Sequence, residues 1–337
     1  MKYKEQIKDA NIYKEEYLNS LLKLISDMHK DAEKQRIANF HEMKNNQAAY
    51  RKEFIKMLGW PLTDYQHNIP NAKKMLVTKE ENMSVYRIQI DLPIGLKFYG
   101  IYFEHTDKGK LPLVIAQHGG DGSAELCSGF FEDGTENYNN MVLRIFNKGV
   151  NVFAPQLLIW KGDLHELPFQ RERIDAKLKQ VGSSITAVEV YALLKSIDYL
   201  SLQESIDSDR IGMIGLSYGG FYTLFTTAVD TRIKAALSSC FYNSREKYSW
   251  VDWTWKDAGF KFFDNEIAYL IYPRHLFLEV GEKDSLFLVE TAKKEYEKLL
   301  KEIEDTSWID FTVFDGEHEF NKDDKNIERL IEFLNNF

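Results

Sequence analysis

The chain has 337 residues, 44% hydrophobic and 28% charged, a globular composition long enough for one large domain with an extension. Its net charge of −9 argues against a nucleic-acid-binding protein, which would carry a basic face, and no apolar run is long enough to cross a bilayer. Cys127 and Cys240 cannot make a disulfide framework, and the charged N-terminus has no apolar signal segment, so we expect a reduced, cytoplasmic protein away from membranes.

The N-terminal region, up to about residue 58, is predicted to be helical. Apolar residues recur there at helical spacing, among them Leu18, Leu21, Leu22 and Ile25. We expect these helices to pack as an extension against the rest of the chain. An oligomerisation arm or part of a lid is the alternative. The predicted division places the helical extension at residues 1–73 and a second domain at residues 74–337.

Strand patterns begin after about residue 74. Val85–Leu92 and Leu96–Phe103 are expected to form a hairpin around Pro93-Ile94-Gly95. The segment Trp160–Val181 is predicted to be polar and irregular. Short apolar runs then alternate with helical stretches, which favours a mostly parallel sheet covered on both faces. The runs are Leu111–Gln117, Val152–Leu157, Ile211–Ile214, Ile233–Ser239, Leu276–Val280 and Ile309–Phe314, and the helices are Tyr138–Phe146, Ser184–Leu200, Phe221–Val229, Leu286–Ile303 and Lys325–Phe337.

The motif Gly215-x-Ser217-x-Gly219 lies between the run Ile211–Ile214 and the helical stretch that begins at Phe221. A serine at such a strand–turn–helix junction is thrown clear of the backbone, and the small residues on either side avoid collisions with the neighbouring strand and the helix. N–H groups at the helix start favour a developing negative charge. We therefore predict that Ser217 is a nucleophile; an incidental serine in a turn is the alternative.

The stretch Gly215 to Phe221, Gly-Leu-Ser-Tyr-Gly-Gly-Phe, resembles the nucleophile elbow of the α/β-hydrolase superfamily. Its form is similar to that of dienelactone-hydrolase-like esterases, acetyl xylan esterases and prolyl-oligopeptidase-type peptidases. The resemblance covers roughly residues 96–337. It implies an α/β-hydrolase fold, with residues 74–337 as the catalytic domain, and the chain order serine, acid, histidine for the catalytic residues.

His318 is the predicted general base. It directly follows the last expected strand, where a loop can carry an imidazole back over the serine. A solvated loop histidine between two glutamates is the alternative. His275 opens a strand at the wrong end of the sheet, and His105 and His118 precede the serine.

Asp284 is the predicted acid, after the expected strand Leu276–Val280. Judged by the residues alone, it could instead cap the helix that follows, and Glu282 is a rival carboxylate. The segment Pro273 to Asp284 resembles the acid-bearing strand of these esterases, which implies that Asp284 orients the histidine.

The oxyanion of a tetrahedral intermediate needs two preorganised N–H donors. One is predicted to be the backbone of Tyr218, the residue after the nucleophile. His118-Gly119-Gly120 resembles the His-Gly-Gly element of the family, which implies Gly120 as the second donor and Gly119 as the next candidate. Because no metal-ligand or P-loop spacing occurs, we expect no cofactor and no metal.

An aromatic-rich excursion is expected at about residues 241–274. Its tryptophans either wall an acyl pocket, stack on a sugar ring, or only pack the excursion onto the body, and the sequence leaves these readings open. They are Trp250, Trp253 and Trp255.

These patterns predict a serine esterase that cleaves carboxylic esters of small molecules. The family resemblance and the tryptophans favour short-acyl (acetyl) esters and acetylated sugars. A prolyl-oligopeptidase-type serine peptidase is the alternative, although the large propeller domain usual in those peptidases is replaced here by about seventy helical residues. A binding protein on a catalytically dead hydrolase fold is opposed by the presence of all three triad residues in the expected order. The oligomeric state is left open.

Overall fold

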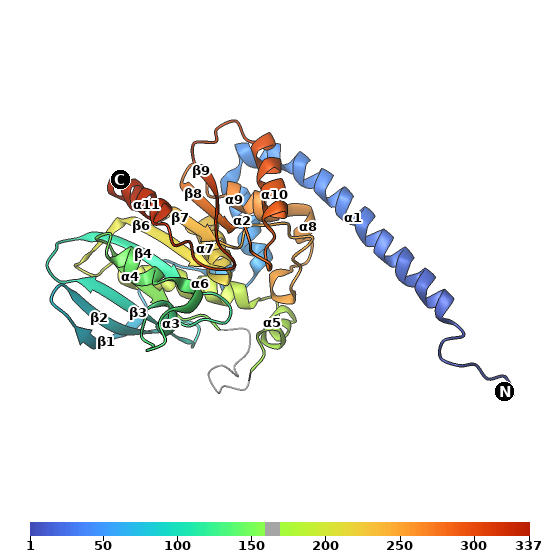
Figure 1. Cartoon of the computed structure of the whole chain (residues 1–337), viewed down its shortest axis with the longest axis horizontal. Helices are drawn as coiled ribbons and strands as arrows, with labels where there is room; N and C mark the ends of the chain where they lie inside the picture. The colour runs from blue at the N-terminus through green and yellow to red at the C-terminus, as the bar shows by residue number, and fades with distance from the viewer. Residues whose placement is uncertain (159–168) are drawn as a thin grey trace.

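Over residues 1–158 and 169–337, which the computed structural model describes, a nine-stranded sheet forms the centre of the molecule (Figure 1). Its strand order is β1-β2-β3-β5-β4-β6-β7-β8-β9. The pairs β1–β2, β2–β3 and β3–β5 are antiparallel, and the remaining pairs are parallel. The strands are β1 Asn71–Lys79, β2 Met83–Asp91, β3 Lys97–His105, β4 Leu111–Gln117, β5 Asn151–Pro155, β6 Ile206–Leu216, β7 Ile233–Ser239, β8 His275–Gly281 and β9 Ile309–Phe314.

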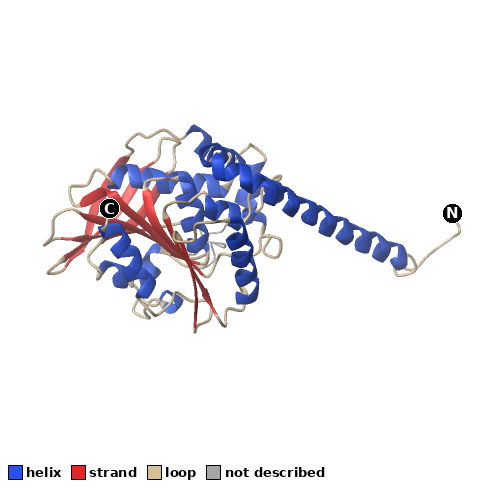
Figure 2. Cartoon of the chain, turned by 90° about the horizontal axis from the view of Figure 1, so that it is seen from above, coloured by secondary structure: helices blue, strands red, loops and turns tan. Residues whose placement is uncertain are grey.

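Helices cover both faces of this sheet (Figure 2). Side chains alternate between the faces along each strand, so β4 contributes to two hydrophobic cores. Leu113 and Ile115 join the core formed with α6, α7 and the N-terminal helices, whereas Val114 and Ala116 join the core formed with α4 and α11. The helices of the body are α3 Ala124–Cys127, α4 Met141–Phe146, α5 Arg171–Lys179, α6 Ile185–Leu200, α7 Tyr218–Val229, α8 Ala258–Lys261, α9 Asp264–Tyr269, α10 Val289–Glu302 and α11 Lys325–Asn335.

The predicted fold class is confirmed: the sheet is mostly parallel, with helices on both faces and a helical N-terminus. One local prediction is wrong in part, because the polar segment 160–181 contains the helix α5. Residues 159–168 lie outside the described residues. The charged sequence of α5 is held by buried polar contacts, since Asp175 accepts a hydrogen bond from the N–H of Ile185 at 2.9 Å. Such contacts leave no apolar periodicity to detect.

The N-terminal region forms two helices, α1 Asn11–Asn45 and α2 Gln47–Leu58. The second half of α1 packs on the body through Ala32, Phe40 and Met43, which are buried. The first half does not, and the leucines that led us to expect packing are exposed. Both views show this part of the helix extending away from the sheet (Figures 1 and 2). The division between domains at residue 73 stays a prediction.

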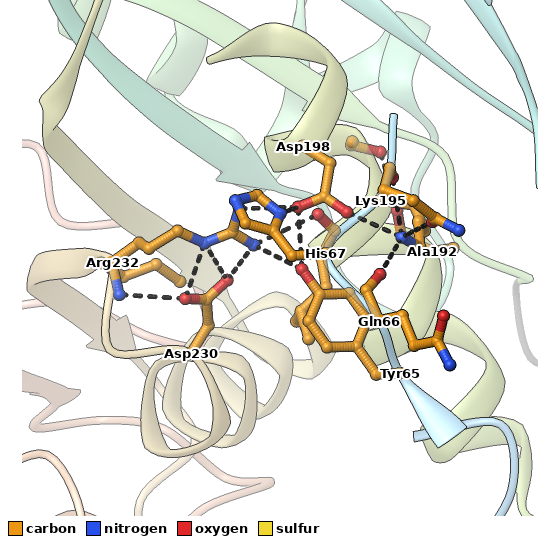
Figure 3. Close-up of polar contacts among 12 residues, drawn as sticks. Tyr65, Gln66, His67, Ala192, Lys195, Asp198, Asp230 and Arg232 are labelled. Carbon is orange, nitrogen blue, oxygen red and sulfur yellow. Dashed lines mark hydrogen bonds and ion pairs between the residues drawn. The ribbon is translucent and has the colours of Figure 1, made fainter. Parts of the chain in front are cut away.

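A buried polar cluster fastens the segment after the short 3-10 helix η1, Leu62–Asp64, to the body (Figure 3). Its centre is Asp198 on α6, which accepts from Lys195 at 2.8 Å, from Arg232 at 2.7 Å and from the hydroxyl of Tyr65 at 2.8 Å. Burial alone would raise the pKa of Asp198, but these three hydrogen bonds outweigh it and hold the pKa below its ordinary value.

Among the described residues, no helix is both long and apolar enough to cross a membrane.

Candidate active site

Ser217 lies in a sharp turn between β6 and α7. Its φ of 58° and ψ of −119° are unusual for a residue other than glycine, so the surrounding packing must hold this conformation. A Cβ at Gly219 would overlap the carbonyl oxygen of Gln117 at the end of β4, and a Cβ at Gly215 would overlap the backbone of Gly219. The two glycines therefore let the neighbouring strand and the helix approach the serine closely.

Asp284 and His318 meet across the ends of two neighbouring strands, β8 and β9. The Nδ1 of His318 lies 2.8 Å from the Oδ2 of Asp284. The other oxygen, Oδ1, accepts hydrogen bonds from the N–H groups of Leu286 and Phe287 at 2.8 and 2.9 Å. Oδ1 of Asp284 thus fixes the turn before α10, but Asp284 does not cap that helix, which begins at Val289 after Leu288 and has no side-chain cap. The side chain of Asp284 is fully buried. The rival acid, Glu282, is exposed.

A cavity of about 230 Å³ brings together the serine, the histidine and the glycine-rich loop. Ser217, His318 and Gly120 are among its lining residues, so the predicted nucleophile, base and oxyanion loop share one space. Asp284, the predicted acid, is not among these lining residues but contacts His318. The remaining lining residues are half polar, namely Asp121, Glu136, Asn137 and Tyr138, and otherwise Gly119, Leu126, Leu216 and Leu286.

The two candidate glycine donors differ in what their backbone does. The N–H of Gly119 donates to the hydroxyl of Tyr138 at 2.8 Å, so it is already committed. This arrangement favours Gly120 over Gly119 as the donor to an oxyanion. Burial raises the pKa of the Tyr138 phenol, which therefore stays protonated at neutral pH. Position 122 accommodates only glycine beside this phenol, because a Cβ there would overlap the hydroxyl of Tyr138.

A short segment that no sequence pattern predicted connects both loops of the site through hydrogen bonds. Glu136–Tyr138 forms the 3-10 helix η2, and Asn139 follows it in the left-handed region. Tyr138 holds the glycine-rich loop, while the amide of Asn137 donates to the carbonyl of His318 at 3.1 Å. The amide of Asn139 donates to the carbonyl of Phe320 at 2.6 Å. The helix predicted over Tyr138–Phe146 is therefore wrong in its first turn, because Asn139 and Asn140 adopt left-handed conformations and α4 begins at Met141.

The aromatic excursion packs behind the elbow. Trp253 is buried, with its ring centroid 4.6 Å from that of Tyr218, 5.3 Å from that of Phe221 and 5.1 Å from that of Phe241. No tryptophan is among the described residues that line the cavity. The geometry therefore favours packing over an acyl-pocket wall for Trp253.

A buried ionic cluster fixes this excursion against the helices. Arg171 of α5 contacts Glu189 of α6 and Asp252 at 2.8 Å each. Asp252 also accepts from the hydroxyl of Tyr218 at 2.7 Å. The side chain of the residue after the nucleophile is thus held by a charge-assisted network.

One group of potential metal ligands occurs within residues 1–158 and 169–337, namely Cys240, Asp284 and His318. Burial, and then the nearby Asp284, raise the pKa of the Cys240 thiol, which disfavours the thiolate that binds metals. The other two side chains are hydrogen-bonded to each other. The donor set therefore fits a Ser-His-Asp arrangement better than a metal centre.

The strand order, the elbow after β6 and the positions of Asp284 and His318 define an α/β-hydrolase fold. Residues 180–337 match the family model of the prolyl oligopeptidase family. Over 202 residues the chain is 27% identical to YtaP of Bacillus subtilis (strain 168), which is provisionally named a hydrolase. That alignment covers 57% of this chain and 64% of YtaP, so the chain spans less than two thirds of this relative.

Two solved structures are similar over most of the chain. A protein of Bacteroides fragilis NCTC 9343, provisionally named an acetyl xylan esterase, superposes with a TM-score of 0.62 at 13% identity, covering 82% of this chain and 76% of that one. The glucuronoyl esterase of Solibacter usitatus has a TM-score of 0.60 at 14% identity, covering 84% and 92%. At these identities the likeness establishes the fold.

Proposed function

We propose that the protein is a serine hydrolase that cleaves carboxylic esters through an acyl-enzyme. The observation that carries this proposal is the 2.8 Å contact between His318 and the buried Asp284, with Ser217 and His318 lining the same cavity. A serine hydroxyl is a poor nucleophile at neutral pH, and it needs a base whose tautomer is fixed by a third group.

In the proposed reaction, the Oγ of Ser217 attacks the ester carbonyl while Nε2 of His318 accepts its proton. Asp284 accepts the hydrogen bond from Nδ1 and stabilises the imidazolium. The N–H groups of Tyr218 and Gly120 bind the oxyanion. The C–O bond to the alcohol then breaks as His318 returns the proton to the leaving oxygen. Water, activated by His318, releases the acid and regenerates the serine.

The size and lining of the cavity support a short acyl group and a polar alcohol. A volume of about 230 Å³ has little room for a long chain, and the side chains of Asp121, Glu136 and Asn137 can accept hydrogen bonds from hydroxyl groups. Acetylated sugars have both features. The names of the structurally similar esterases, acetyl xylan and glucuronoyl, agree with a carbohydrate ester.

A prolyl-oligopeptidase-type peptidase is the second candidate, favoured by the family match over residues 180–337. The two candidates are separated by assaying p-nitrophenyl acetate and acetylated xylo-oligosaccharides beside a prolyl p-nitroanilide. We expect turnover of the acetates and little of the anilide. Faster cleavage of the anilide would favour the peptidase.

The nucleophile is tested with Ser217→Ala, which should lower kcat by about 10⁴-fold or more because triad residues act as a unit. Ser208→Ala, at an exposed serine, is the matched control and should leave kcat unchanged. A fluorophosphonate probe should label Ser217 alone. Activity of Ser217→Ala within tenfold of the unmodified protein would overturn the assignment.

A further inference from the structure

The first half of α1 is a long apolar surface that the rest of the chain leaves uncovered. We call residues 11–28 the arm. It contains nine large hydrophobic side chains that are exposed, with exposed fractions from 37% for Leu21 to 71% for Tyr17. At 1.5 Å per residue the arm is about 27 Å long, and it extends from the body in both views (Figures 1 and 2). So much contiguous exposed apolar surface usually marks an interaction site.

The exposed apolar face of the arm continues the face by which α1 packs on its own body. Steps of three and four residues lead from Leu18 through Leu22, Ile25 and Met28 to the buried part of the helix. They continue there through Ala32, Arg36, Phe40 and Met43. Residues at this spacing share one side of a helix. The packing stripe therefore runs along the whole helix, with Arg36 as its one charged member between Ala32 and Phe40, but its first half has no counterpart in the described residues.

The opposite side of the helix is polar and exposed to solvent. Within the arm this side carries Glu16, Lys23 and Asp27, which are exposed. It continues beyond the arm in the ion pairs Asp27–Lys30 and Asp31–Lys34, at 3.1 and 3.0 Å, with side chains that are more than half exposed. Because both signs of charge alternate there, this is not the lysine- and arginine-rich polar face with which amphipathic helices lie on anionic membranes.

The charges of the chain also point to the occupant. Residues 1–28 contain five lysines and five acidic residues, which cancel, so the net charge of −9 lies wholly in residues 29–337. The arm itself, residues 11–28, contains two lysines and three acidic residues, a net charge of only −1, so it does not select a strongly basic or acidic partner. Two arms therefore repel each other far less than two bodies do.

We propose that the arms of two copies of this chain pair through this face, in antiparallel orientation, and form a homodimer. A two-fold axis through the middle of the arm places the apolar face of one copy against the identical face of the other. Antiparallel pairing places the two acidic bodies at opposite ends of the paired helices. Parallel pairing would hold them side by side.

The test is the molar mass of the full-length protein by light scattering after gel filtration, from about 1 to 100 µM. We expect twice the chain mass of 39.4 kDa for the unmodified protein and a single chain mass for Leu21→Glu/Ile25→Glu. Ser20→Glu/Lys23→Gln also lowers the net charge by two but changes the polar side, so it should stay dimeric. Circular dichroism must show that each variant keeps its helix content.

Orientation is tested by cross-linking Lys14→Cys and Met28→Cys chains, since both native cysteines are buried. Mixed chains should cross-link to each other more than either does to itself. Predominant self-cross-linking at residue 14 would overturn the antiparallel arrangement. A monomer over the whole concentration range, or a dimer that the Leu21→Glu/Ile25→Glu change leaves intact, would overturn the proposal. Neither result bears on the proposed esterase chemistry.

Discussion

At the scale of single residues, Asp284 is the most constrained side chain of the candidate site. One oxygen holds the histidine and the other holds the turn that leads to α10. Its carboxylate is therefore needed for the local fold as well as for the orientation of the imidazole. Glu282, two residues earlier, is exposed.

Asp284→Asn should lower kcat by about 10³- to 10⁴-fold, because an amide at this position can present an N–H to Nδ1 and favour the wrong tautomer of His318. Glu282→Gln, with the same change from carboxylate to amide, should leave kcat within about twofold. Both are measured by steady-state hydrolysis of an acetyl ester. If Glu282→Gln is the more damaging change, the acid has been assigned wrongly.

At the scale of elements, η2 and Asn139 join the two loops on which the proposed chemistry depends. Tyr138→Phe keeps the ring but removes the acceptor for the N–H of Gly119. We expect kcat to fall on the order of tenfold with little change in KM, less than the 10²–10³ for losing an oxyanion donor outright. Tyr99→Phe removes a hydroxyl that contacts Glu125 instead, and it is the control. Equal effects of the two changes would count against this positioning role.

The aromatic excursion should govern stability more than substrate choice. Trp253→Ala removes a ring from a buried stack, so it should cost about 3–5 kcal/mol of unfolding free energy.

The preference for acetyl over octanoyl esters should respond instead to Leu126→Ala or Leu286→Ala, which enlarge the cavity itself. Denaturant titrations and kcat/KM across acyl lengths measure the two effects. Rising kcat/KM with chain length in the unmodified protein would contradict a short-acyl pocket.

Local sequence patterns predicted the elements that bury apolar side chains. The bounds predicted for β4 and β7 match the structure, because buried strands are mostly apolar runs flanked by polar turns. Those of β9, a half-buried edge strand, match because its apolar residues alternate with Asp310 and Thr312. The helix α5 was missed since its stability comes from Arg171 and Asp175, whose partners lie far along the chain or in the next helix. Tyr138 was missed for the same reason: its function depends on a backbone N–H nineteen residues away.

At the scale of the whole molecule, buried carboxyls in the sheet should shape the dependence of stability on pH. Burial raises the pKa of Glu279 in β8 to about 7, although hydrogen bonds from Asn321 and Asn326 oppose this shift. The folded protein therefore holds a proton that the unfolded chain releases near pH 4.3. Stability from this group falls as pH rises from there to about 7, and stays low above it.

Glu279→Gln keeps the shape of the side chain and cannot ionise. The difference in melting temperature, Glu279→Gln minus unmodified protein, should increase by a few degrees as pH rises from 5 to 8. Thermal unfolding of both proteins at each pH measures it. Exposed Glu282→Gln should show no such trend. A constant difference between Glu279→Gln and the unmodified protein across this range would mean that Glu279 titrates normally.

The distribution of acidic groups has a consequence for diffusional encounter. The body carries a net charge of −9, and Asp121 and Glu136 line the cavity beside Ser217. An ester that bears its own negative charge must approach against this field, whereas a neutral acetate is indifferent to it. Because the Debye length shortens to about 10 Å at 0.1 M ionic strength, added salt should raise kcat/KM for anionic esters and leave neutral ones unchanged. The acidic residues at the cavity, Asp121 and Glu136, would thus make anionic esters encounter Ser217 more slowly than neutral esters.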